Sequence, residues 1–130
     1  MRFVIALCVA LSGAACGGAQ KPRSTGMQEL AAEIDAESAD VARIIHDLRA
    51  DCPRMALALK SVFARMSASF DRARTAQKDP ALAKELTTYL RSYDDVTKQR
   101  DAAIEADLAE NSTCARDAAV RDTMMTMPTL

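Results

Sequence analysis

The spacing of the apolar residues constrains the fold of this chain more than any other feature. From residue 27 onward, apolar side chains recur at intervals of three and four positions. This spacing places them on one face of an α-helix, whereas a half-buried strand would alternate every second residue. The first apolar stripe consists of Met27, Leu30, Ile34, Val41, Ile44 and Leu48. Aromatic residues make up only 4% of the chain, which also favours helices over sheets.

Two further stripes continue the helical spacing. The second consists of Met55, Leu59, Val62, Met66, Phe70 and Ala73, with Phe63 beside it. The third consists of Leu82, Leu86, Tyr89, Leu90, Tyr93, Val96, Ile104 and Leu108. Glu37 interrupts the first stripe, and Arg100 lies on the third, where we expect its charged end to extend toward solvent. The stripes predict an all-α fold with helices over about 27–52, 53–78 and 80–110.

Polar residues and prolines mark the expected helix ends. Asp79 followed by Pro80 is typical of an N-cap and a first helical residue. Near the end of the chain, we expect a short helix that is capped within residues 111–113 and terminated by Pro128.

Pro53 is compatible with two arrangements, because the apolar spacing stays in phase across it. Residues 27–78 could form one helix kinked at Pro53, or the chain could turn there and begin a second helix. The single helix would be about 78 Å long, which a chain of this size could not bury well. We therefore favour the turn.

The first residues form a segment of a different kind. Arg2 precedes an apolar run over residues 3–11, and small residues follow, which is the pattern of a secretory signal. The run is too short to cross a bilayer, which requires about 20 apolar residues. A general signal peptidase would find small residues at Gly13 and Ala15. A buried N-terminal helix is the alternative interpretation.

The residues around Cys16 resemble the lipobox of bacterial lipoproteins, in which a cysteine preceded by small residues is acylated and becomes the first residue. Gly13 stands where that family prefers leucine. The resemblance implies a signal peptide over residues 1–15, a palmitate-type lipid anchor on Cys16 and attachment to a membrane. Residues 16–26, rich in glycine and small polar residues, are typical of a flexible tether. Because Gly17 rather than aspartate follows the cysteine, the resemblance implies the outer membrane, facing the periplasm, rather than the inner membrane.

Two cysteines remain once Cys8 has left with the signal and Cys16 carries the lipid. Cys52 and Cys114 form an even pair in a chain bound for an oxidising compartment, so we expect a disulfide between them. Two separately buried thiols are the alternative. An up-down bundle brings both cysteines to one end, whereas a hairpin of one long helix would leave them about 12 Å apart along the axis.

The charges are segregated along a chain whose formal net charge is only −1, which gives no reason to expect nucleic acid binding. Residues 27–52 carry −5, residues 54–78 carry +5 and residues 80–110 carry −3. A basic helix between two acidic ones favours antiparallel packing in this order. Binding of anionic lipid headgroups or glycans by the basic segment is the alternative use of its charges.

No residue pattern in the sequence is typical of an enzyme. His46, the only histidine, lies off the first stripe, so we expect it in solvent. The sequence has no nucleophile elbow, no phosphate-binding glycine loop and no paired histidine ligands for a metal. Three methionines, Met124, Met125 and Met127, carry soft thioethers that suit Cu(I), although an apolar helix end is the simpler interpretation.

Together these features predict a three- to four-helix up-down bundle over residues 27–130, carried behind a signal peptide and a flexible tether. We expect a lipid-anchored, non-enzymatic interaction or structural module of the cell envelope, with no cofactor and with an envelope protein as its partner. The alternative is a soluble periplasmic bundle that binds a small ligand or Cu(I).

Overall fold

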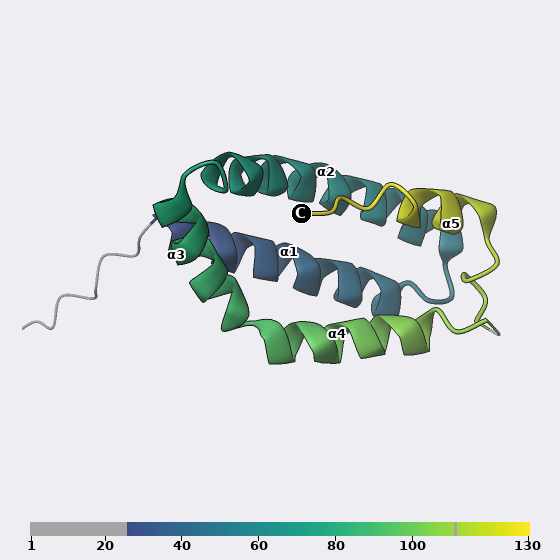
Figure 1. Cartoon of the computed structure of the whole chain (residues 1–130). Coiled ribbons are helices and arrows are strands. Elements are labelled where there is room, and N and C mark those ends of the chain that lie inside the picture. The colour runs from purple at the N-terminus through teal and green to yellow at the C-terminus, as the bar shows by residue number, and fades with distance from the viewer. Residues whose placement is uncertain (1–25, 111) are drawn as a thin grey trace, which may run out of the picture.

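The computed structural model describes residues 26–110 and 112–130, which form five helices and no strand (Figure 1). The helices are α1 (Gly26–Asp47), α2 (Cys52–Ala76), α3 (Pro80–Arg91), α4 (Asp94–Asp107) and α5 (Ala118–Met124). The all-α prediction is therefore confirmed for this part of the chain. Within it, no helix is both long enough and apolar enough to cross a membrane. The predicted signal peptide and Cys16 lie outside the described residues.

The chain turns between α1 and α2, as the position of Pro53 predicts, and the alternative of one kinked helix is wrong. The first helix ends at Asp47, and Asp51 caps the second. The Asp51 carboxylate accepts a hydrogen bond of 3.3 Å from the backbone N–H of Arg54. Pro53 fits this first turn because the amide that it lacks would have no helical partner there.

Asp79 caps α3 as predicted, accepting hydrogen bonds from the backbone N–H groups of Ala81 at 2.8 Å and Leu82 at 3.3 Å. The helix expected over residues 80–110, however, is divided into α3 and α4. At the break the Ser92 hydroxyl donates to the carbonyl oxygen of Tyr89 at 2.6 Å. In a continuous helix the Tyr93 amide would donate to this carbonyl, but it donates to the carbonyl of Leu90. A side-chain hydrogen bond thus competes with the helical one, although the apolar spacing continues through the break.

The last helix also begins later than predicted. Its N-cap is Asp117, whose carboxylate accepts from the Val120 amide at 3.0 Å, so the cap predicted within residues 111–113 is wrong. The helix ends at Met124, four residues before Pro128. A helix continued through Pro128 would lack the hydrogen bond to the Met124 carbonyl and would clash with it.

The helices alternate in direction around the core. Arg72 pairs with Glu33 and Arg65 pairs with Asp40, so α2 runs antiparallel to α1. Residues 125–130 continue beyond α5 alongside α2 (Figure 1), where the Arg74 guanidinium donates to the carbonyl oxygen of Thr129 at 2.9 Å. The four sides of the molecule are therefore α1, α2, the α3–α4 pair, and α5 with the segment that follows it.

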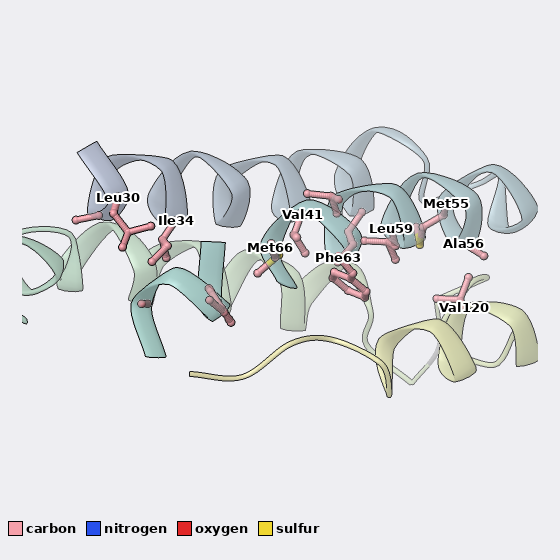
Figure 2. Close-up of a cluster of buried hydrophobic side chains, with 14 of the residues drawn as sticks. Leu30, Ile34, Val41, Met55, Ala56, Leu59, Phe63, Met66 and Val120 are labelled. Carbon is pink, nitrogen blue, oxygen red and sulfur yellow. The ribbon is translucent and has the colours of Figure 1, made fainter. Parts of the chain in front are cut away.

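The hydrophobic core lies mainly between α1 and α2 and is closed at one end by α5 (Figure 2). In the close-up, Val120 of α5 points toward Met55 and Ala56 of α2. The largest apolar side chains that are fully buried are Ile45, Met55, Leu59, Leu86, Val62 and Val120. Helix α2 contributes more buried residues than any other described helix, and α4 contributes none.

The acidic helix α1, rather than the basic α2, occupies the middle of the packing. It contacts α2 on one side and α3 and α4 on the other, whereas α4 has almost no contact with α2. The basic helix therefore does not separate the two acidic segments as the charge pattern suggested. Arg100 of α4 forms a bidentate ion pair with Asp35 of α1, which reduces the repulsion between these two acidic helices.

Candidate functional site

The two cysteines expected to pair lie together at one end of the bundle. Cys52 is the first residue of α2, and Cys114 lies in the loop between α4 and α5. Both are buried, their Cα atoms are 5.2 Å apart, and a disulfide joins them. The pairing predicted from the up-down arrangement is thus present in the structure. It links residues 62 positions apart, so it restricts the unfolded chain over nearly half its length.

His46 lies on the surface, as predicted. Its Nδ1 atom lies 3.1 Å from a carboxylate oxygen of Asp107 on α4, an arrangement that links the ends of α1 and α4. Residues 26–110 and 112–130 contain no group of three or more histidine, cysteine, aspartate or glutamate side chains placed to hold a metal ion.

The three methionines considered as Cu(I) ligands are not gathered at one point. Met124 is half-buried and lines an open hollow with Leu108, whereas Met125 is 86% exposed at the edge of the same hollow. Met127 lines a different hollow, between α2 and α4. Met124 agrees with the interpretation of an apolar helix end that packs on the bundle, whereas the exposed Met125 does not.

The basic residues of α2 mostly pair with acidic side chains, as the simpler interpretation of their charge predicts. Arg65 and Arg72 reach across to α1, and Arg54 and Arg74 pair with acids of their own segment. The hydrogen bond from Arg72, at 2.5 Å, lowers the pKa of the Glu33 carboxyl. Hydrogen bonds from Arg43 and Arg65 lower the pKa of Asp40 in the same way.

Glu37 is an exception in this otherwise paired interface. Its side chain is 7% exposed, and its Oε2 atom accepts no hydrogen bond from any described residue. The hydrogen bond with Glu33 is the main cause that raises the pKa of the Arg72 guanidinium, and Glu37 adds a smaller electrostatic contribution. The interruption of the first apolar stripe was visible in the sequence, but burial of the carboxylate was not.

Two neighbouring hollows lie between α2 and α4, above α1. One hollow of about 190 Å³ and another of about 240 Å³ share Ser38 of α1, Phe70 of α2 and Thr97 of α4 in their linings. We call the two together the α2–α4 groove. The end of the chain borders both hollows, since Met127 and Pro128 line the first and Leu130 lines the second.

Sequence reasoning missed this groove. Its walls come from helices that are distant in the sequence, and its floor is part of the first apolar stripe. Pro128 was the available signal, because a proline soon after a short helix indicates that the fourth side of the bundle cannot be helical along its full length.

Comparisons with known proteins add no relative. The chain matches no protein-family model, and neither a curated protein nor a solved structure matches it. Its function must therefore be inferred from its own residues.

Proposed function

We propose that this chain is a lipid-anchored helical bundle of the bacterial cell envelope that binds another protein and catalyses no reaction. The observation that carries this proposal is the disulfide between Cys52 and Cys114. Disulfides persist in exported proteins and are rare in the reducing cytosol. The disulfide therefore supports the export that the signal-like segment over residues 1–15 predicts.

The anchor itself rests on the lipobox-like residues before Cys16. Acyl chains on this cysteine would hold the protein firmly, because each buried CH₂ group contributes about 0.8 kcal/mol. The tether up to Gly26 would let the bundle stand at most about 35 Å from the membrane surface when fully extended. With glycine at position 17, we place the anchor in the outer membrane, with the bundle facing the periplasm.

Substitution of the anchoring cysteine tests the proposal. We expect the full chain with Cys16→Ser to leave the membrane fraction, because the attachment site of the lipid is lost. Cys8→Ser is the matched control, and it should leave the protein in membranes because it changes only the segment that is removed. Fractionation of cells followed by mass spectrometry of the N-terminus measures both variants. An unmodified N-terminus after Ala15 or Ala19 in the unsubstituted protein would contradict the proposal.

A further inference from the structure

The fourth side of the bundle is helical for only part of its length. Helix α5 has 7 residues and is about 10 Å long, whereas α2 has 25 residues and is about 37 Å long. Residues 125–130 continue along α2 without helical structure (Figure 1). The α2–α4 groove is the space that the rest of a fourth helix would occupy, with α2 and α4 as walls and α1 as floor.

The segment over residues 127–130 covers the groove incompletely. Met127 remains 42% exposed and Leu130 remains 52% exposed. Within the described part of the chain, one hydrogen bond reaches residues 128–130, from Arg74 to the Thr129 carbonyl. Because few contacts hold this segment, a ligand with more apolar area could take its place.

The α4 wall of the groove carries unpaired negative charge. Asp101 lines the first hollow and Asp94 lines the second, seven residues apart on the same helix. Neither takes part in an ion pair among the described residues. Arg100, which lies between them and also lines the first hollow, is paired with Asp35. A ligand that fits this wall should therefore carry positive charge beside its apolar face.

We propose that the α2–α4 groove binds an amphipathic helix of a partner protein, whose apolar face replaces residues 127–130 and whose lysine or arginine side chains face Asp94 and Asp101. The bound helix completes a four-helix bundle. This inference deepens the proposed function: it rests on the binding of another protein and is independent of the lipid anchor.

A pair of model peptides tests the inference on the purified full chain. The probe is a labelled peptide of sequence LKKLLKLLKKLLKL, and its control is the same peptide with glutamate in place of every lysine. Fluorescence anisotropy should show the lysine peptide binding at least tenfold more tightly to a chain that ends at Thr126 than to the full chain. The glutamate peptide should bind at least tenfold more weakly than the lysine peptide to the shortened chain.

Substitutions in the groove locate the binding. In the shortened chain, Ser38→Phe should abolish binding of the lysine peptide because residue 38 lines both hollows and its ring would obstruct the groove, whereas Ser61→Phe on the exposed side of α2 should not. Asp94→Asn with Asp101→Asn should weaken binding three- to tenfold, and Asp95→Asn on the solvent side of α4 should have no effect. A full chain carrying Met127→Ser and Leu130→Ser provides the same test without truncation, provided that circular dichroism shows unchanged helicity.

Several results would overturn the inference. Equal binding of the two peptides, or unchanged binding after Ser38→Phe, would show that the groove is not the site. Dimerisation of the shortened chain, blocked by Ser38→Phe, would show that a second copy fills the groove. If the shortened chain bound a labelled long-chain fatty acid but not the lysine peptide, the groove would be a lipid site. Because these measurements use purified protein, they can fail while the fractionation of Cys16→Ser succeeds, so the two proposals are distinguishable.

Discussion

Helices α2 and α4 show how differently two helices of one small bundle can be stabilised. Helix α2 buries eleven of its 25 residues, including Met55, Leu59 and Val62, which are 0% exposed. Helix α4 buries none of its 14 residues, and its apolar contribution is limited to the partly buried Ile104, with Leu108 at its C-cap. Helix α2 is therefore part of the core, whereas α4 packs against the outside of it.

Polar contacts take over where α4 lacks apolar ones. Arg100 pairs with Asp35, and Asp107 pairs with His46, so both halves of α4 are tied to α1. Such contacts fix the position of a helix but add less stability than a well-packed apolar face. We therefore expect α4, which forms one wall of the α2–α4 groove, to open before α2.

Matched substitutions of a large apolar side chain by alanine are the strongest test of this difference between α2 and α4. Leu59→Ala in α2 should lower the free energy of unfolding by about 3 kcal/mol, because it leaves a cavity in the core. Ile104→Ala in α4 should cost about 1 kcal/mol, since its side chain is only partly buried and its surroundings can relax. Urea denaturation monitored by circular dichroism measures both. Similar losses would mean that α4 belongs to the core as much as α2 does.

Removal of the disulfide tests the covalent link beyond the end of α4. Replacing both cysteines, Cys52→Ser with Cys114→Ser, should lower the free energy of unfolding by about 2–4 kcal/mol while the protein stays helical at low temperature. The link restricts the unfolded chain, and it also holds the loop between α4 and α5 against α2. Thermal denaturation of the oxidised, reduced and substituted proteins provides the measurement. Two free thiols in the purified, unreduced protein would contradict the pairing.

Glu37 is a buried charged residue in the well-packed interface between α1 and α2, so it tests whether burial there is always stabilising. Glu37→Leu should raise the free energy of unfolding by about 1 kcal/mol, since an apolar side chain would replace a buried carboxylate with an unpaired oxygen. Glu33→Leu is the matched control one turn earlier; it should give no gain because it removes the pair with Arg72. If Glu37→Leu is destabilising, the buried carboxylate has a role in the interface that its contacts do not reveal.

The smallest expected effect concerns acid. The folded protein lowers the pKa of Glu33 and of Asp40, so their pairs with arginine stabilise it at neutral pH. This stabilisation is complete above the ordinary carboxyl pKa values of 4.5 and 3.8, and it is lost as the pH falls through the lowered ones. Both carboxylates are partly exposed, so the loss should be about 0.5 kcal/mol or less. Glu33→Gln with Asp40→Asn should flatten the dependence of stability on pH between 5 and about 2.5.

Much of the fold followed from local sequence signals. The turn at Pro53 and the cap at Asp79 were predicted correctly because each depends on the chemistry of a few neighbouring residues. The approach of Cys52 and Cys114 followed from helix lengths and alternating directions. The cap at Asp117 was missed because residues 111–113, which are also good capping residues, lie only a few positions before it. Cys114 lies between the two candidates, and its disulfide with Cys52 fixes the position of this loop.

What the sequence determined by itself was therefore the helical content, the apolar face of each helix and the end of the bundle where the cysteines lie. The tertiary structure alone decided which helix covers which face: α4 packs on α1 and not on α2, Arg100 pairs with Asp35, and the end of the chain borders the groove that remains. The physical reason is that periodicity specifies how much apolar surface a helix must bury but not what buries it. That choice depends on side-chain volumes and charges from distant parts of the chain, which meet only when the bundle is assembled.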